Sequence, residues 1–184
     1  MLAHDCDLTD IGLISRAAGG DAPAFQSLYD RHWKAVYSYA WLLTRSVSDA
    51  EDVTQECFLA LLHKPGAFDP ARAALRTWLI AIVRRQCFTR YRNLRHEAGS
   101  EELEHARTEA GFDAELIHQE RASAVRAAVN ALPQAQREAL YLFEFEGLSL
   151  TEAAEVLEIE VNAVKARIFR AREQLKRSLS RRDL

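Results

Sequence analysis

The chain has 184 residues, of which 48% are hydrophobic and 28% are charged, and its formal net charge at pH 7 is -3. This length suffices for one ordinary domain or two small ones with a modest core. Membrane insertion is not expected, because no uninterrupted apolar stretch approaches the roughly 20 residues of a bilayer-spanning helix, and residues 1–13 lack the features of a secretory signal.

The cysteines and histidines show no pattern typical of an active site. Cys6, Cys57 and Cys87 are far apart, and none belongs to a CxxC pair or to a cluster with the spacing of zinc ligands. The six histidines form no ligand or triad pattern, and there is no glycine-rich phosphate loop. We therefore expect no enzyme, no metal and no cofactor, and a reducing cytoplasm is the favoured location.

Charge is strongly segregated along the chain despite the small net value. Residues 72–96 hold seven arginines and no acid, residues 97–120 carry eight acids against one arginine, and residues 165–184 hold eight basic residues against two acids. One basic run alone is as compatible with a solvated helix face as with a binding surface. Two unmixed basic blocks in an acidic protein favour contacts with nucleic-acid phosphates.

The fold class follows from periodicity. Glycine and proline are scarce and fall at joints, and the segments between them have helical periodicity without sustained strand-like alternation. The sequence therefore predicts an all-α protein of two small helical domains, residues 1–96 and 122–184. A flexible acidic linker over residues 97–121 joins them.

Two helices begin the first domain. The first extends from Phe25 to about Leu43. The second is expected to follow Ser48 as its N-cap, with Glu51 completing a capping box, and to end at Pro65. Beside its apolar residues runs an acidic stripe made of Asp49, Asp52 and Glu56.

A third helix follows a loop over residues 67–74. Its buried side is predicted at helical spacing on Leu75, Trp78, Leu79 and Ile82. The side away from this core is basic and aromatic, with Arg84, Phe88, Tyr91 and Arg95. Such a face suits single-stranded DNA, because arginines follow phosphates while rings stack on unpaired bases. The alternative, equally weighted, is that the rings pack on a neighbouring helix and the arginines are merely solvated.

The second half predicts four helices. One includes residues 125–132 and breaks before Pro133, and the next extends from Gln134 to about residue 146. Ser149 and Glu152 are placed to form a capping box that opens a short helix to about residue 157. After a turn over residues 158–161, the final helix continues to about residue 179.

The last two helices have the spacing of a helix-turn-helix. In the final helix, an apolar stripe that must face the core consists of Val164, Ile168, Ala171, Leu175 and Leu179. The other face carries Asn162, Lys165, Ala166, Phe169 and Arg170. A phenylalanine among basic residues is typical of a helix in the DNA major groove, where it can touch a thymine methyl while cations reach base edges or phosphates. A protein-binding helix is the alternative.

Three stretches resemble the extracytoplasmic-function (ECF) group of the sigma-70 family. Residues 49–58, DAEDVTQECF, resemble its polymerase-binding helix, and residues 76–79, RTWL, followed by Ile82, resemble the start of its promoter-melting helix. Its C-terminal DNA-binding domain is resembled by Leu132-Pro133, by Arg137, and by EGLS at 146–149 and VKARIFRAR at 164–172. The order and spacing of these motifs carry the resemblance over nearly the whole chain.

The resemblance implies a sigma factor, which binds core RNA polymerase, recognises the minus-35 promoter element as duplex and melts the minus-10 element. It places the polymerase clamp helices against Asp49, Glu51, Asp52, Gln55 and Glu56. Contacts with the minus-10 strand would involve Arg72, Arg76, Arg84, Arg85, Phe88, Tyr91, Arg92 and Arg95. Contacts with the minus-35 duplex would involve Arg137, Asn162, Lys165, Ala166, Phe169 and Arg170.

The resemblance also implies an anti-sigma factor as partner and a cytoplasmic location, nucleoid-associated when the protein is active. Glu158 stands where the family usually has a turn glycine, so either it tolerates that turn's backbone conformation or the turn is slightly different. Arg85 and Thr89 replace a common asparagine and aspartate of the promoter-melting helix, so the minus-10 base preference of relatives does not transfer. Glu158, Glu160 and Asn162-Ala163 depart from the usual helix-turn-helix residues, so the minus-35 sequence does not transfer either. The alternative function is a conventional helix-turn-helix regulator, whose first half would hold a ligand-binding or dimerisation domain instead.

Overall fold

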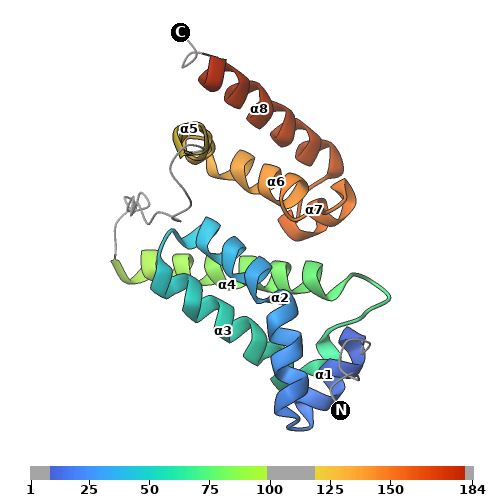
Figure 1. Ribbon diagram of the computed structural model, residues 1–184. Coiled ribbons are helices and arrows are strands. Elements are labelled where there is room, and N and C mark those ends of the chain that lie inside the picture. The colour runs from blue at the N-terminus through green and yellow to red at the C-terminus, as the bar shows by residue number, and fades with distance from the viewer. Residues whose placement is uncertain (1–8, 99–118, 181–184) are drawn as a thin grey trace. The chain divides into compact units, whose positions relative to one another are not determined.

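The computed structural model describes residues 9–98 and 119–180, and every regular element within them is helical (Figure 1). The predicted all-α class is thereby confirmed. These residues form two compact units, 9–98 and 119–180. None of their helices is both long and apolar enough to cross a bilayer. Most of the predicted linker lies outside the described residues, so the domain limits stay a prediction.

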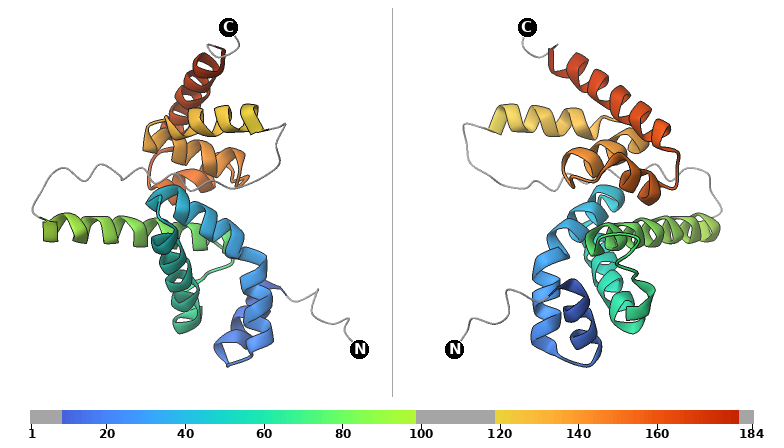
Figure 2. Two further views of the ribbon diagram at one scale, coloured as in Figure 1. Left: turned by 60° about the vertical axis from the view of Figure 1, so that its left-hand side comes forward. Right: turned by 90° about the vertical axis from the view of Figure 1, so that its right-hand side faces the viewer.

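Helix α2, Ala22–Thr44, is the centre of the first unit. It packs against α1 (Asp10–Ala18), α3 (Val47–His63) and α4 (Leu75–Ala98), as Figure 2 shows. The Asp21 carboxylate caps it by accepting a hydrogen bond from the Ala24 backbone N–H, and a proline occupies its first turn. The fully buried side chains between these helices include Leu13, Leu28, Val36, Val53, Leu61 and Leu79.

Two residues, Arg45 and Ser46, join α2 to α3. Arg45 has left-handed backbone angles, φ 55° and ψ 21°, and its N–H donates to the Trp41 carbonyl over 2.9 Å. Ser46 has extended angles, and its hydroxyl accepts a hydrogen bond from the Asp49 N–H. The prediction that Ser48 caps this helix, with Glu51 completing a capping box, was therefore wrong. An N-cap needs a non-helical backbone, and Ser48 already lies inside the first turn.

Helix α3 ends at His63, and a 3-10 turn at Pro65–Ala67 precedes the loop to α4. The start of α4 at Leu75 agrees with the prediction, but its buried stripe is turned. Leu75 and Leu79 are buried as expected, together with Ile80 and Val83, whereas Trp78 and Ile82 are only half-buried. The reason is that α4 packs against two helices, α2 and α3, so its core face is set by both.

The second unit contains α5 (Gln119–Asn130), α6 (Gln134–Glu144), α7 (Leu150–Leu157) and α8 (Val161–Ser180). Helix α8 packs against the other three. The predicted capping box of α7 is confirmed, because the Ser149 hydroxyl accepts from the Glu152 N–H over 3.2 Å and the Glu152 carboxylate accepts from the Ser149 N–H over 2.9 Å. The core of this unit includes Ala139, Leu142, Ala153, Leu157, Val164 and Ile168.

Candidate nucleic-acid and protein interfaces

All five predicted polymerase-binding residues lie on the exposed side of α3, namely Asp49, Glu51, Asp52, Gln55 and Glu56. The opposite side of the same helix is buried through Val53, Cys57 and Leu61. Four carboxylates therefore face outward along one helix and form a surface complementary to a basic partner.

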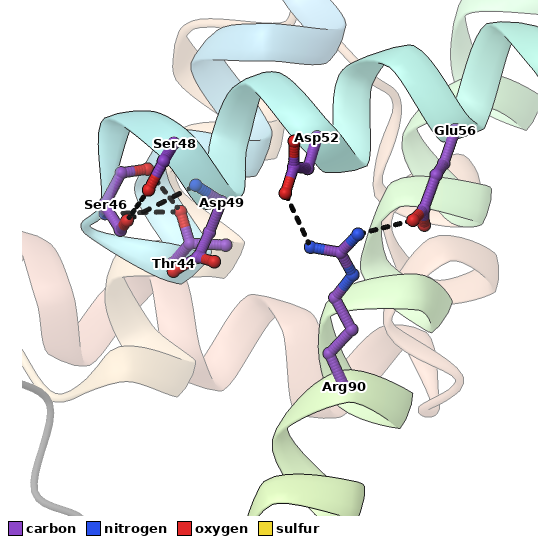
Figure 3. Close-up of polar contacts among 7 residues, drawn as sticks. All are labelled: Thr44, Ser46, Ser48, Asp49, Asp52, Glu56 and Arg90. Carbon is purple, nitrogen blue, oxygen red and sulfur yellow. Dashed lines mark hydrogen bonds and ion pairs between the residues drawn. The ribbon is translucent and has the colours of Figure 1, made fainter.

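Arg90 of α4 contacts two carboxylates of the acidic stripe, a feature that the sequence reasoning missed (Figure 3). Its Nη2 donates to Glu56 Oε1, and its Nη1 lies 3.7 Å from Asp52 Oδ2. Burial alone would lower the pKa of Arg90, but the hydrogen bond to Glu56 and the charges of Glu56, Asp52 and Asp49 outweigh burial and raise that pKa. No local sequence pattern signals this contact, because its partners are separated by 34 residues and lie on different helices.

The buried stripe of α4 explains where Arg90 points. Leu79, Val83, Cys87 and Arg90 follow one another at helical spacing, so Arg90 continues the side of α4 that packs on its neighbours. The Cys57 thiol of α3 lies on the same seam, 3.5 Å from the Leu79 carbonyl oxygen. Burial, and to a lesser extent the Cys87 thiol, raise the pKa of Cys57 to about 12. The seam between α3 and α4 is therefore apolar in its middle and closed by an ion pair at the edge.

The predicted basic and aromatic face of α4 is largely on the surface. Phe88 is 43% exposed, and the Arg84 guanidinium carbon lies 4.7 Å from the centroid of its ring. Tyr91 is half-buried, and the exposed predicted residues are Arg72, Arg76, Arg85 and Arg92. The Arg95 side chain lies outside the described residues. Asp69 shapes the loop before α4, since its carboxylate accepts from the Ala71 N–H and its carbonyl from the Arg72 N–H.

Helix α8 presents the predicted minus-35 face away from its own core. Val164, Ile168 and Ala171 are buried, while Phe169 is 66% exposed. Asn162, Lys165 and Arg170 are also exposed, and Ala166 is half-buried. Leu175 and Leu179 are only half-buried, so the apolar stripe predicted along the whole helix is fully buried only in its first half. Within α8, this buried stripe determines which side chains face outward.

The turn before α8 has the backbone conformation expected from the resemblance. Glu158 has φ 54° and ψ 45°, in the left-handed region that favours glycine. Its N–H donates to the Glu155 carbonyl over 3.2 Å, and the Ile159 N–H donates to the Ala154 carbonyl over 3.1 Å. The expectation that a glutamate tolerates this turn is confirmed.

Two arginines of the second unit make internal contacts. The Arg137 Nη1 donates to the carbonyls of Asn130 and Leu132 at the end of α5, over 2.9 and 3.3 Å. Burial lowers the pKa of Arg137, and the Glu138 charge only partly offsets this. Arg172 joins α8 to α6 through an ion pair with Glu144. Arg137 thus has a structural role at a helix C-terminus, and its contact with DNA stays a prediction.

Comparison with known proteins identifies the family. Residues 28–97 match sigma-70 region 2, and residues 122–175 match sigma-70 region 4. The chain is 32% identical over 171 residues to the ECF RNA polymerase sigma factor SigM of Mycobacterium tuberculosis, covering 93% of this chain and 85% of that protein. It is 32% identical over 185 residues to the ECF RNA polymerase sigma-E factor of Haemophilus influenzae, covering 94% and 96%. The chain therefore belongs to the ECF group of the sigma-70 family.

Solved structures agree with this assignment. The structure of CnrH in complex with the cytosolic domain of CnrY has a TM-score of 0.63 and 30% sequence identity, covering 93% of this chain and 97% of that chain. The sigma factor RpoE of Bartonella quintana, solved with the anti-sigma factor NepR, shares the fold with a TM-score of 0.69 and 24% identity, covering 85% and 96%.

As an ECF sigma factor, the protein is a non-enzymatic subunit of RNA polymerase that directs promoter-specific transcription initiation. Family membership also decides between the two interpretations of the helix-turn-helix. Region 2 occupies the part of the chain where a conventional regulator would carry a ligand-binding or dimerisation domain.

Proposed function

We propose a division of labour between two domains, residues 1–96 and 122–184, joined by the linker 97–121. The first docks on core RNA polymerase and holds the melted minus-10 strand, and the second reads the minus-35 duplex. The observation that carries this proposal is the outward face of α8, where the exposed Phe169 stands among cations opposite a buried stripe.

Docking is assigned to Asp49, Glu51, Asp52, Gln55 and Glu56. Their exposure on one side of α3 supports this role, because opposite charges steer and orient a basic partner surface. The remaining side of α3 is occupied by the core, so the docking face cannot turn inward without unfolding the unit.

Contacts with the minus-10 strand are assigned to α4 and the loop before it. The contacting residues are Arg72, Arg76, Arg84, Arg85, Phe88, Tyr91, Arg92 and Arg95. An exposed ring next to guanidinium groups offers stacking for an unpaired base and charge for the adjoining phosphates. Phe88 stays 43% exposed with the Arg84 guanidinium carbon 4.7 Å from its ring centroid, and an exposed ring beside a cation suits a base held by stacking.

The minus-35 duplex is assigned to Asn162, Lys165, Ala166, Phe169 and Arg170, with Arg137 on a phosphate. Helix α8 follows the capped helix α7, as the recognition helix of a helix-turn-helix does. Lys165 and Arg170 can reach base edges or phosphates, and the neighbouring apolar groups can contact a thymine methyl.

We also propose that an anti-sigma factor regulates this protein in the cytoplasm, and that the released protein associates with the nucleoid. Two similar proteins, CnrH and the Bartonella RpoE, were solved with the cytosolic domain of CnrY and with NepR, respectively. A partner that covers α3 or α8 would block docking or duplex recognition.

The test begins with core binding. Labelled full-length protein is titrated with bacterial core RNA polymerase, and the double variant Asp52→Lys/Glu56→Lys is compared with the natural sequence. Reversing two charges at the docking face should weaken binding by about tenfold or more, because like charges would then meet across the interface. A matched control is Asp30→Lys, an exposed acid on α2 outside the docking face.

Equal binding by the double variant and the natural sequence would reject the docking assignment. Run-off transcription of genomic DNA by the reconstituted holoenzyme, followed by sequencing of the transcripts, gives both promoter elements. If specific initiation is absent, the division of labour is rejected as well.

A further inference from the structure

In the free protein a cation already contacts the acidic stripe. This cation is Arg90 of α4, the helix to which the minus-10 strand is assigned. Arg90 bonds Glu56 and lies 3.7 Å from the nearer Asp52 oxygen, so it partly neutralises two of the carboxylates assigned to polymerase docking (Figure 3). Arg90 lies on the packed side of α4, away from Phe88 and Arg92. Its contact is therefore part of the seam between α3 and α4.

The contact is accessible to a competing cation. The side chains of Asp52 and Glu56 are 63% and 49% exposed, while that of Arg90 is 33% exposed. Ion pairs that are open to water in this way contribute little free energy, because solvent and salt screen them. A partner surface that brings several cations at once can thus take over both carboxylates.

The contact also lies beyond the apolar part of the seam. Within residues 75–92 of α4, the part whose side chains the structure describes, Cys87 is the last buried apolar residue, and Arg90 is one turn further along the helix. Arg90 is therefore positioned to hold the end of α4, residues 88–98, against α3. Losing this contact leaves that end with fewer restraints, although Leu79, Ile80 and Val83 keep the rest of the helix packed.

From these observations we propose that Arg90 is a positioning residue that competes with polymerase for Asp52 and Glu56, so that docking releases the end of α4 from α3. The proposal rests on the docking role given to the acidic stripe above. Its consequence is a linkage between sites: the same carboxylates hold the promoter-melting helix in the free protein and the polymerase in the holoenzyme.

The first experiment measures core binding of Arg90→Gln by titrating the labelled full-length protein with core RNA polymerase. Removing the internal competitor should tighten binding by about two- to fivefold, the range expected for an exposed ion pair. Lys34→Gln removes one exposed positive charge from α2 and serves as the matched control, with unchanged affinity expected. Equal or weaker binding of Arg90→Gln relative to the natural sequence overturns the proposal.

A double-mutant cycle separates competition from a general charge effect. In a Glu56→Gln background the Arg90→Gln gain should shrink or vanish, because the hydrogen-bonded carboxylate to be released is already gone. A gain that persists in full in this background contradicts the competition. If Arg90→Gln does not fold, Arg90→Lys replaces it. A lysine cannot bridge two carboxylates as a guanidinium does, so a smaller gain is expected and no gain overturns the proposal.

Hydrogen exchange tests the release of α4. Core binding should raise amide exchange at residues 88–98 of the natural protein, and free Arg90→Gln should show the raised exchange already. Exchange that stays low in both cases overturns the release. Failure of the docking assignment can be told apart from failure of the competition proposal. In the first case Asp52→Lys/Glu56→Lys binds core polymerase as the natural sequence does, independently of the result for Arg90→Gln.

Discussion

Helices α4 and α8 are both rich in arginine, and we assign DNA contacts to both. On each helix some cationic side chains are paired within the protein and others are open to a DNA phosphate. On α4, Arg90 is paired with acids of α3, and Arg84 lies over the Phe88 ring. On α8, Arg172 is paired with Glu144 of α6, whereas Lys165 and Arg170 are exposed on the outward face and form no ion pair within the described ranges. The difference shows that helix packing, and not the number of basic residues, decides which cations a nucleic acid can reach.

The largest expected effect would sharpen this comparison on the α8 side. Phe169→Ala combined with Arg170→Ala should lower promoter-specific initiation by about 10- to 100-fold, because a specific base contact contributes about 1–3 kcal/mol. Thermal stability should change little, since both side chains are exposed. Run-off transcription and thermal unfolding provide the two measurements.

Lys176→Ala is the matched control for that variant, because it removes an exposed cation from a later turn of α8. Its effect on initiation should be clearly smaller. If the double variant instead lost core binding, the separation of roles between the two units would be refuted.

An intermediate effect concerns the seam of α3 and α4. Burial raises the pKa of Cys57 from 9.0 to about 12, so the folded state keeps this thiol protonated while the unfolded chain loses the proton above about pH 9. The contribution of the protonated thiol to the unfolding free energy is fully present below pH 9 and is lost as pH rises toward 12. The unfolding free energy should fall over this range by at most about 1.4 kcal/mol per pH unit.

Cys57→Ala should remove this part of the pH dependence. Urea unfolding at pH 8 and at pH 10 should therefore show a smaller decrease for the variant than for the natural sequence, even if the variant is less stable at both values. Parallel decreases would mean that water reaches the thiol, and the description of a dry seam would be incorrect.

The smallest expected effect concerns the turn before α8. Glu158→Gly should raise the unfolding free energy by at most about 1 kcal/mol, because glycine relieves a left-handed conformation but gains entropy in the unfolded chain. Glu158→Ala keeps the unfavourable backbone angles and is the control, with no gain expected. A larger gain for alanine than for glycine would assign the strain to the carboxylate instead of the backbone.

The sequence predicts most of the second unit because its signals are local. The capping box depends on residues 149–152 alone, and the outward face of α8 follows from a single stripe at regular spacing. The backbone conformation of Glu158 is also set locally, since the turn requires left-handed backbone angles at that one position.

The errors in the first unit have a common cause in tertiary packing. Ser46 and Ser48 both suit an N-cap, and the choice depends on where α2 ends and the chain turns at Arg45. Ile80 and Val83 are buried because α4 meets two neighbours, which periodicity along one helix does not reveal. The position of Arg90 on the acidic stripe likewise requires the placement of α4 against α3.

The two-residue joint between α2 and α3 has a consequence for length variation. Arg45 and Ser46 each have a required backbone conformation, so the joint has no slack. One inserted residue would rotate α3 by about 100° about its axis, and the docking carboxylates would turn away from their partner. An inserted residue should therefore disturb core binding more between Thr44 and Val47 than in the loop over residues 64–74, where it leaves the orientation of α3 unchanged. The corner at Arg45 and Ser46 thus fixes the rotation of the docking helix about its axis.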